Sequence, residues 1–488
     1  MKQLLLPVLL CSTLVSFAQK TGKPEAYAKT ITSADLKKHL YIVAGAEMEG
    51  RETGTEGQRK AAAYIENEFR RIGLQPGFNG TYQQPYPLYQ DSLAGAKLEI
   101  NGQPFQLFQD FSLSVANSVA GTFRLGEVVS IAKSNAAGID SADLGGKLVL
   151  LFADAANPAI VSKLRTKAPA GVMIVSSTYK APAQPMRKGR LMVQAFRKSL
   201  PLQELTISED IAKAILKNNY EAAKTATGTP KGYPAEVLLQ VDKALVTTQS
   251  SNVLGVLPGT DKADEYLIVT AHYDHEGKRE NGVIYYGADD DGSGTVSVIE
   301  LAEAFAKAKK EGKGNRRSIL FMTVSGEEKG LLGSEYYGSH PTIDLAKATA
   351  NLNIDMIGRI DPKRTQGDST NYVYVVGDDK LSTDLRTISE SVNNKFIKME
   401  LDYKYNDPND KEFIYYRSDH YNFAKNGVPI IFYFNGTHAD YHRPTDTPDK
   451  INYTLMEKRA RLVFHTAWEM ANRNDMLKRD LELPPMRR

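Results

Sequence analysis

The sequence predicts an α/β protein with a mostly parallel mixed sheet sandwiched by helices and an inserted α+β module. Two observations predict this class. From Ser250 onward, short and almost wholly apolar strands alternate with helices, which is typical of a parallel sheet buried on both faces. Between about Val115 and Thr247, short β-prone runs are separated by Gly- and Ala-rich turns, so we interpret this stretch as a separate module.

Length and composition allow more than one domain. The chain has 488 residues, of which 42% are apolar, so it is longer than one ordinary domain and can form a sizeable core. Its 61 basic and 58 acidic residues leave a net charge of +3 without a long run of one sign. This balance excludes the electrostatic pattern of a nucleic-acid-binding protein. We expect peptides or small molecules as partners, and nothing in the sequence indicates an oligomeric state.

The N-terminal residues 1–18 are expected to be a signal peptide. Lys2 precedes an apolar stretch from Leu4 to Phe17, and small side chains at Ser16 and Ala18 suit cleavage after Ala18. The apolar stretch is short for a helix that must cross a hydrocarbon core of about 30 Å. We therefore expect export, to the periplasm or the extracellular space, with no membrane anchor after cleavage.

The only cysteine, Cys11, lies inside this segment. Leu10 precedes it, where a bacterial lipoprotein signal usually has a small residue, so lipidation is not expected. The mature chain would contain no cysteine, and therefore neither disulfides nor thiolate metal ligands. Any metal ion would have to be held by imidazole and carboxylate groups.

Changes in composition and in hydrophobic periodicity along the chain suggest the domain boundaries. In the N-terminal part, apolar residues from Ala62 to Ile72 recur at helical spacing, after a Thr55–Gln58 pair that resembles a capping box, and Gly73 ends the helix. The inserted module contains no histidine, which favours a lid or substrate-access role without chemistry. The expected division is 1–18 signal peptide, 19–115 N-terminal part of the main domain, 116–247 inserted module, 248–475 main-domain core, and 476–488 polar tail.

Ionisable side chains follow four predicted strands at the point where each strand ends. In open α/β sheets, ligands bind at the carboxyl ends of strands. Four strands would therefore bring imidazole and carboxylate groups to one edge of the sheet. The strands are Tyr266–Ala271, Ser318–Val324, Leu352–Asp355 and Pro429–Phe434; a helix is expected at Thr295–Ala308; and the side chains are His272 and Asp274, Glu327 and Glu328, Asp355, and His438 to His442.

Taken singly, these motifs are ambiguous. A His-x-Asp pair such as His272 and Asp274 often occurs by chance, although the carboxylate can hold the imidazole from behind. The three acids within Gly287–Gly294 also suit a solvated turn of calcium-like composition, but one of them could bridge two cations. Glu327 and Glu328 follow a buried strand, where unpaired charge is costly, so one can bind a metal while its neighbour faces the substrate. Their combination at four strand ends indicates a metal site.

The order of these motifs resembles the co-catalytic dinuclear zinc peptidases, which include bacterial leucyl aminopeptidases and glutamate carboxypeptidase. The resemblance spans Ser250–Ile451, and Glu49–Gly54 resembles the family more weakly. The resemblance implies a zinc exopeptidase, phosphorylase/hydrolase-like fold, and the inserted module is similar to a protease-associated domain. The motifs are His272-x-Asp274, Gly287-Ala-Asp-Asp-Asp-Gly-Ser-Gly294, Gly326-Glu-Glu328, Asn353-x-Asp-Met-x-Gly358 and Tyr441-His-x-x-x-Asp446.

Carried over to this chain, the resemblance implies two Zn²⁺ ions. It assigns His272 and Asp355 to one ion, Glu328 and His442 to the other, and Asp290 to both. Each ion would then have one imidazole, one terminal carboxylate and a share of the bridge, which leaves a position for water. The resemblance also implies a cis peptide bond after Asp290.

The resemblance further implies that Glu327 is the general base. We expect Asp274 to support His272 from behind. Tyr441 is either a hydrogen-bond donor to the tetrahedral oxyanion or a packing residue beside a ligand. Two further histidines lie near these residues in the sequence and are not expected to bind zinc: His275 and His438.

The sequence thus predicts a secreted zinc-dependent aminopeptidase that hydrolyses N-terminal residues through a metal-bridging hydroxide, with Glu327 as base. A carboxypeptidase or a glutaminyl cyclase could use the same constellation. The first needs basic groups for the substrate carboxylate, and a cyclase of this lineage usually keeps one zinc. A catalytically dead binding ectodomain would have lost ligands, whereas all five and Glu327 are present. The preferred terminal residue is not predicted, because loops form the pocket walls.

Overall fold

The structure is a computed structural model that describes residues 22–152, 158–407 and 409–484. The predicted signal peptide 1–18, with Cys11, lies outside the described residues. The chain divides into two compact units, unit 1 (Met1–Tyr86 and Ser250–Arg488) and unit 2 (Pro87–Gln249). Within the described ranges, no helix has both the length and the apolar character needed to span a bilayer.

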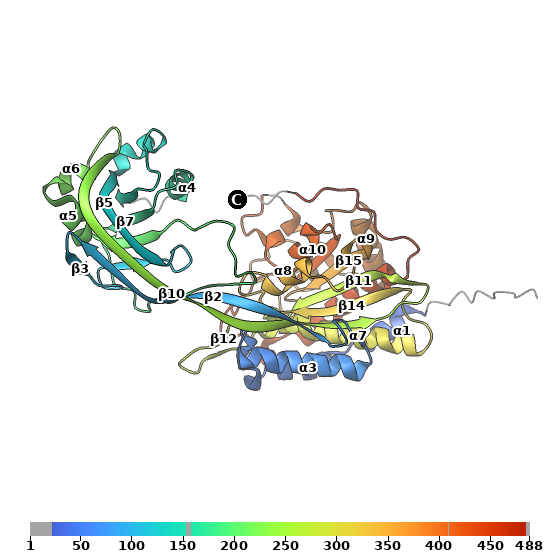
Figure 1. Ribbon diagram of the computed structural model, residues 1–488. Coiled ribbons are helices and arrows are strands. Elements are labelled where there is room, and N and C mark those ends of the chain that lie inside the picture. The colour runs from blue at the N-terminus through green and yellow to red at the C-terminus, as the bar shows by residue number, and fades with distance from the viewer. Residues whose placement is uncertain (1–21, 153–157, 408, 485–488) are drawn as a thin grey trace, which may run out of the picture. The chain divides into compact units, whose positions relative to one another are not determined.

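Unit 1 is built on a mixed sheet whose central strands are parallel. β18, β15, β11 and β14 are neighbours and run parallel, while β16 and β10 run antiparallel to β18 and β14. The four predicted strands are therefore adjacent, and because they run parallel their carboxyl ends share one edge. Figure 1 labels three of them, β11, β14 and β15. The strands are β10 (Lys231–Leu257, which begins in unit 2), β11 (Lys262–His272), β14 (Arg317–Val324), β15 (Ala348–Ile354), β16 (Tyr372–Val376), β17 (Glu400–Asp402) and β18 (Ile430–Phe434), with short β1 (Gln75–Pro76), β12 (Gly277–Lys278) and β13 (Ile284–Tyr285).

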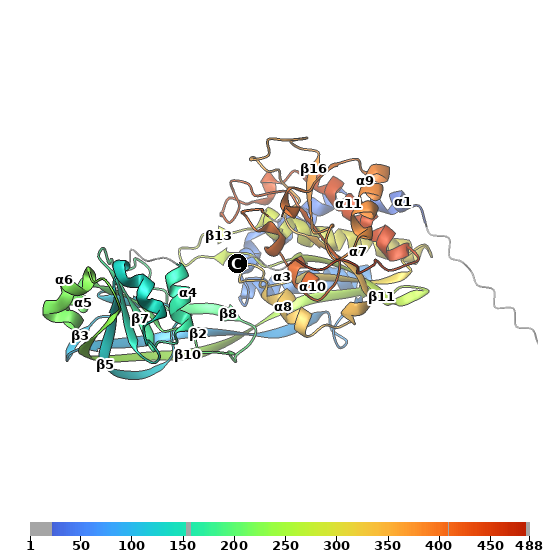
Figure 2. The same cartoon turned by 90° about the horizontal axis from the view of Figure 1, so that it is seen from above.

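Helices cover both faces of this sheet (Figures 1 and 2). Side chains alternate along β11, so Leu267 and Val269 pack on one face and Ile268 on the other. The first face is covered by α1 (Pro24–Ala28), α2 (Ser33–Val43), α3 (Glu56–Ile72), α7 (Gly294–Lys310), α9 (Asp384–Phe396) and α11 (Tyr453–Asn472), and the second by α8 (Leu332–Ser339) and α10 (His420–Lys425). The predicted class is confirmed.

The predicted N-terminal helix is α3, and its ends follow the expected signals. Thr55 Oγ1 accepts a hydrogen bond from the backbone N–H of Gln58 at 3.5 Å, and Gly73 ends the helix in the left-handed conformation with φ 91°. The second half of the capping box is absent, because Gln58 Nε2 donates to the Tyr273 hydroxyl. The side chain thus fixes α3 to the loop after β11.

Unit 2 contains a parallel group of strands, with helices and further strands around it. It begins at Pro87, earlier than the predicted residue 116, because Leu98, Phe105 and Phe111 belong to its core. Period-2 alternation looks the same in either unit, so the sequence pattern alone did not show this boundary. The parallel strands are β5 (Gly121–Ile131), β6 (Leu148–Phe152), β7 (Gly171–Ser176) and β9 (Glu204–Ser208), accompanied by β2 (Gln83–Ile100, which begins in unit 1), β3 (Gln103–Phe105), β4 (Phe111–Leu113), β8 (Lys188–Met192), α4 (Pro158–Thr166), α5 (Glu209–Leu216) and α6 (Tyr220–Lys224).

The predicted polar tail begins with residues that pack on unit 1. Leu477 is buried, and its backbone N–H donates to Thr349 Oγ1 at 3.0 Å. Arg479 donates to the carbonyls of Leu345 and Ala348. The first residues of the tail therefore belong to the folded unit.

Candidate metal centre

The polar residues after the four parallel strands meet at the carboxyl edge of the unit 1 sheet, as predicted. The loop ahead of α7 joins them there and brings a further carboxylate. Five different segments of unit 1 therefore bring their side chains together at this edge. The residues are His272 at the end of β11, Glu327 and Glu328 after β14, Asp355 after β15, His442 after β18, and Asp290 ahead of α7.

Asp290 faces a different histidine with each of its carboxylate oxygens. Oδ1 is 3.2 Å from Nε2 of His272, and Oδ2 is 3.1 Å from Nε2 of His442. Glu328 Oε2 lies 3.1 Å from the same His442 nitrogen, and Asp355 Oδ1 lies 3.7 Å from His272 Nε2. Two ligand atoms on one tetrahedral zinc are about 3.3–3.6 Å apart, because each bond is about 2.0–2.2 Å long. The five side chains thus form two adjoining groups that share Asp290.

Several polar atoms of these groups are buried without a hydrogen-bond partner, namely His272 Nε2, Asp290 Oδ2 and Glu328 Oε1. Buried polar atoms are normally paired, and an unpaired buried charge is costly. In the described part of the chain, Asp290, Glu327, Glu328 and Asp355 form ion pairs with histidines and with no Lys or Arg. Imidazole and carboxylate donors in this arrangement fit zinc.

The carboxylates and imidazoles shift one another's pKa. Burial works to raise the pKa of Asp290, but His272 and His442 outweigh it and hold that pKa well below its usual range. Burial likewise works to lower the pKa of His272, but Glu327 and its acidic neighbours raise it well above the usual value. Burial, together with repulsion by Glu328, raises the pKa of Glu327 well above normal. The site therefore attracts positive charge, which metal ions would supply.

Asp274 lies beside His272, and its backbone carbonyl is closer to the imidazole than the carboxylate that we expected to support it. His272 Nδ1 is 3.1 Å from the Asp274 carbonyl oxygen and 3.7 Å from its carboxylate Oδ1. The carboxylate instead accepts hydrogen bonds from Thr53 Oγ1 at 2.5 Å and from the backbone N–H of Glu327 at 3.2 Å. Asp274 thus links the β11 loop to the candidate base.

Two residues hold the candidate ligands Asp355 and Asp290 in place through hydrogen bonds. Ser418 Oγ donates to Asp355 Oδ2 at 2.6 Å. The carboxylate of Asp446 accepts from the backbone N–H groups of Asp289 and Asp290 at 3.0–3.2 Å. Sequence reasoning did not find the role of Ser418, because the contact joins residues 63 positions apart.

Asp291 ties the Asp290 loop to the sheet. Its carboxylate accepts hydrogen bonds from the backbone N–H groups of His272, Gly294 and Met356 at 3.2, 2.8 and 3.0 Å. The Asp290–Asp291 peptide bond is cis, as the resemblance implies.

Tyr441 packs against His442 and also lines the adjacent pocket. The two rings stack with centroids 3.9 Å apart at an angle of 21°. The Tyr441 hydroxyl accepts a hydrogen bond from Arg417 Nη2 at 3.2 Å. Polar and apolar side chains share this pocket: Asp290, Glu327, Asp355, Arg417, Thr437 and Tyr441 on the polar side, and Met356, Ile414, Phe432 and Phe434 on the apolar side.

The two histidines that were not expected to bind zinc lie in different places. His275 is fully buried, and its Nδ1 is 2.7 Å from Glu328 Oε1 and 3.8 Å from Asp290 Oδ2. These three residues lie within reach of one ion. His438 contacts Asp289, with Nε2 3.2 Å from Oδ2. Only His275 therefore joins the candidate metal centre.

Arg51 is fully buried behind the metal centre and supports the Asp290 loop. Its guanidinium donates to the carbonyls of Val43, Tyr273, Tyr286 and Gly287 at 2.6–2.9 Å. Burial lowers its pKa to about 10, although the neighbouring carboxylates counter this shift. Arg51 lies in the short segment whose resemblance to the family was weak, and the structure gives this segment a clear role.

Comparison with known proteins bears on this site. Residues 252–467, the segment with the candidate ligands, match the model of peptidase family M28. The predicted resemblance is confirmed. A probable leucine aminopeptidase of Trichophyton verrucosum is 30% identical over 227 residues, which are 45% of this chain and 57% of that protein. The match to this relative therefore spans little more than half of its length.

Solved structures share the fold at low sequence identity. An aminopeptidase from Aneurinibacillus sp. strain AM-1 superimposes with a TM-score of 0.57 at 18% identity, over 95% of this chain and 100% of that chain. A zinc aminopeptidase from Bacillus subtilis gives a TM-score of 0.52 at 18% identity, over 93% and 99%. The likeness shows that this chain shares the fold of these two aminopeptidases.

Proposed function

We propose that the protein is a zinc-dependent aminopeptidase that removes N-terminal residues from peptides. The observation that supports this most directly is the position of Asp290 between His272 and His442, with one carboxylate oxygen toward each imidazole. The M28 match and the names of the relatives, a probable leucine aminopeptidase and a zinc aminopeptidase, support the same function.

The candidate ligands would hold two zinc ions. His272 and Asp355 would bind one ion, Glu328 and His442 the other, and Asp290 both. Zinc, when bound, lowers the pKa of a water molecule and polarises the scissile carbonyl. The protein contributes the fixed spacing of the two groups and the burial that strengthens their electrostatic effect.

Glu327 is the proposed general base. Its Oε2 lies 4.0 Å from His272 Nε2, on the wall of the pocket, and Asp274 fixes its backbone N–H. From this position Glu327 takes a proton from the attacking water and delivers it to the leaving amine. Because Glu328 points to His442 and His275, the two adjacent glutamates have different tasks.

Tyr441 is the proposed donor to the tetrahedral oxyanion. Arg417 donates to the Tyr441 hydroxyl oxygen, so the hydroxyl hydrogen is free to point elsewhere. The tyrosine lines the same pocket as Glu327 and Asp355. A hydroxyl that accepts from a guanidinium is also a stronger donor, because linked hydrogen bonds polarise one another.

The pocket wall favours an apolar N-terminal side chain. Met356, Ile414, Phe432 and Phe434 supply apolar surface beside the candidate metal ligands. Burial of a side chain such as leucine there is favourable by about 25 cal/mol per Å² of apolar surface. We therefore expect larger apolar residues to be preferred over charged ones.

One observation favours a second candidate, a carboxypeptidase. Arg417 is the one Lys or Arg side chain among the residues that line this pocket. A guanidinium can bind a substrate carboxylate through two parallel hydrogen bonds. Its contact with Tyr441 favours the first candidate, because it gives Arg417 the role of orienting the proposed oxyanion donor.

Hydrolysis of a blocked-substrate panel separates the two candidates. Purified protein would be assayed on aminoacyl p-nitroanilides, N-acetylated peptides and C-terminally amidated peptides, before and after chelation and zinc restoration. We expect release only from free N-termini, lost with the chelator, restored by zinc and highest for leucine. Cleavage that ignores N-acetylation but requires a free C-terminus would establish the carboxypeptidase instead.

We also propose that the protein is exported. The charged residue, apolar stretch and small residues of 1–18 support removal of a signal peptide. N-terminal sequencing of the mature protein would then begin at Gln19. A mature chain that keeps Met1 would contradict export by this route.

A further inference from the structure

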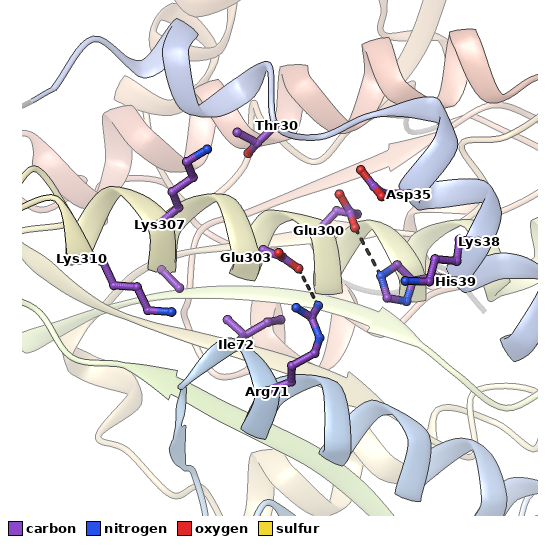
Figure 3. A pocket seen from close by; sticks show the side chains of 11 residues that line it. Thr30, Asp35, Lys38, His39, Arg71, Ile72, Glu300, Glu303, Lys307 and Lys310 are labelled. Atoms are coloured by element: carbon purple, nitrogen blue, oxygen red, sulfur yellow. Dashed lines mark hydrogen bonds and ion pairs between the residues drawn. The ribbon is translucent and has the colours of Figure 1, made fainter.

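A second pocket in unit 1 lies between three helices and contains none of the candidate metal ligands. Its volume is about 360 Å³, within the range of small-molecule sites. It is formed by Thr30, α2, the C-terminal end of α3 and the part of α7 from Glu300 to Lys310 (Figure 3). None of its residues has a role in the proposed hydrolysis.

A buried ionisable pair lies on one side of this pocket. His39 and Glu300 are each only 4% exposed, and His39 Nε2 is 3.4 Å from Glu300 Oε1. The other imidazole nitrogen, Nδ1, is 2.6 Å from the Tyr64 hydroxyl. Among the described residues, His39 is the one ion-pair partner of Glu300. A carboxylate so buried, with one long contact, has unused capacity to accept hydrogen bonds from a ligand.

Lysines without a partner lie on the other side. Figure 3 shows Lys307 and Lys310 of α7 opposite the His39–Glu300 pair, with the Arg71–Glu303 ion pair between them. Within the described residues, neither lysine forms an ion pair, whereas Arg71 and Glu303 neutralise each other at 2.6 Å. One end of the pocket therefore has two lysines without an ion-pair partner, and the other has the carboxylates of Glu300 and Asp35 beside His39 and the exposed Lys38.

We propose that this pocket binds a small zwitterion, with its ammonium at Glu300 and its carboxylate at Lys307 and Lys310. Glu300 and Lys307 are seven residues apart on α7, which is about 10 Å along the helix axis. Long lysine side chains can shorten this span. The expected ligand therefore has the length of a dipeptide, or is an amino acid whose two charged groups are about as far apart. The site does not depend on the proposed hydrolytic function.

Calorimetric titration with 5-aminopentanoate tests this site, because that zwitterion has the required length and no peptide bond. Pentanoate and pentylamine each keep one of its two charges. We expect 5-aminopentanoate to bind the full-length protein at least about tenfold more tightly than either, since each charge-assisted contact contributes that much affinity or more. Equal binding of 5-aminopentanoate and pentanoate would overturn the proposal in favour of a simple anion site.

Variants locate the binding. The double variant Lys307→Met/Lys310→Met alters exposed side chains that make no ion pair, so folding should be retained. We expect it to bind 5-aminopentanoate at least about tenfold more weakly. Lys37→Met is the matched control, because Lys37 is an exposed α2 lysine outside the pocket, and it should bind like the wild type. Unchanged binding by the double variant would show that the ligand sits elsewhere, which contradicts the proposal.

Glu300→Gln separates the two ends of the site. This substitution removes the negative charge and keeps the side-chain shape. We expect weaker binding of 5-aminopentanoate and unchanged binding of pentanoate, which does not need the carboxylate. Equal loss for both probes would contradict the assignment of the ammonium to Glu300.

Discussion

Asp290 shows how a single residue sets the geometry of the candidate metal centre. One oxygen faces His272 and the other faces His442, at 3.2 and 3.1 Å. Its backbone N–H is held by Asp446. The carboxylate of the next residue, Asp291, accepts hydrogen bonds from three backbone N–H groups, which belong to β11, to α7 and to the loop after β15. The carboxylate is thus fixed before any ion binds, and a fixed ligand loses little conformational entropy on metal binding.

At the residue scale, the substitution Glu327→Gln tests whether Glu327 is the general base. In Glu327→Gln the proton carrier is lost, while none of the five proposed ligands changes. We expect kcat for leucine p-nitroanilide to fall by roughly 10²–10⁴, with the zinc content of the wild type. Rate assays and elemental analysis of the same preparation measure both quantities.

Glu280→Gln is the matched control for this prediction, because Glu280 is an exposed glutamate on a turn and should tolerate the change. A Glu327→Gln enzyme that keeps near-normal turnover would disprove the base assignment. Loss of zinc from that variant would instead make Glu327 a ligand.

Arg51 provides a second prediction at this scale. Arg51→Lys keeps the positive charge but cannot reach four carbonyls, which leaves buried acceptors unpaired. Each unpaired buried acceptor costs about 1–3 kcal/mol, so the free energy of unfolding should fall by at least about 3 kcal/mol. Urea unfolding followed by the fluorescence of the single tryptophan, Trp468 in unit 1, measures this loss.

Arg59→Lys is the control, since Arg59 is exposed and pairs with Glu56 on the surface of α3. Its unfolding free energy should stay within about 0.5 kcal/mol of the wild type. A similarly small effect for Arg51→Lys would show that Arg51 does not stabilise the loop.

At the scale of elements, α11 contains a buried histidine that makes stability depend on pH. His465 stacks on Phe396 of α9, with ring centroids 4.1 Å apart at 3°, and its Nδ1 has no hydrogen-bond partner. Burial lowers its pKa from 6.5 to about 4, and Lys395 and Arg461 act in the same direction against Glu25. The folded helix pair therefore holds the neutral imidazole.

This pKa shift predicts a loss of stability on acidification. Between pH 6.5 and 4 the unfolded chain binds a proton at His465 that the folded chain does not, so stability falls as the pH decreases through this window. The effect reaches about 2 kcal/mol at pH 5. Urea unfolding at pH 7 and pH 5, followed by Trp468 fluorescence, should show a smaller acid loss in His465→Phe than in the wild type.

His340→Phe is the control for this experiment, because His340 is exposed. It should lose as much stability between pH 7 and pH 5 as the wild type does. If His465→Phe behaves in the same way, the histidine is not the origin of the acid sensitivity.

At the scale of the whole molecule, the proposed chemistry belongs to unit 1 and the inserted residues form a unit with a core of their own. All five candidate ligands and Glu327 lie within residues 252–467, the segment that matches family M28. Strands β2 and β10 each continue from one unit into the other. The start of unit 2 at Pro87 therefore lies inside a continuous strand, β2, and not at a turn.

Much of the fold and of the site followed from local patterns. Apolar strands that alternate with helices predicted a mostly parallel sheet, and ionisable residues at the strand ends predicted their convergence on one edge of it. Contacts between distant segments could not be predicted in this way. Examples are the hydrogen bond from Ser418 to Asp355, the hydrogen bonds from Arg51 to four carbonyls, and the ion pair of His275 with Glu328. These contacts depend on loop conformations that tertiary packing decides.

If two zinc ions share Asp290, hydrolysis requires both of them. Zinc titration into chelated full-length protein tests this, with bound zinc and leucine p-nitroanilide hydrolysis measured at each step. We expect activity to reach its plateau at two zinc ions per chain, and Asp290→Asn to bind fewer and to stay inactive. Full activity without zinc, or undiminished zinc binding and activity in Asp290→Asn, would contradict it.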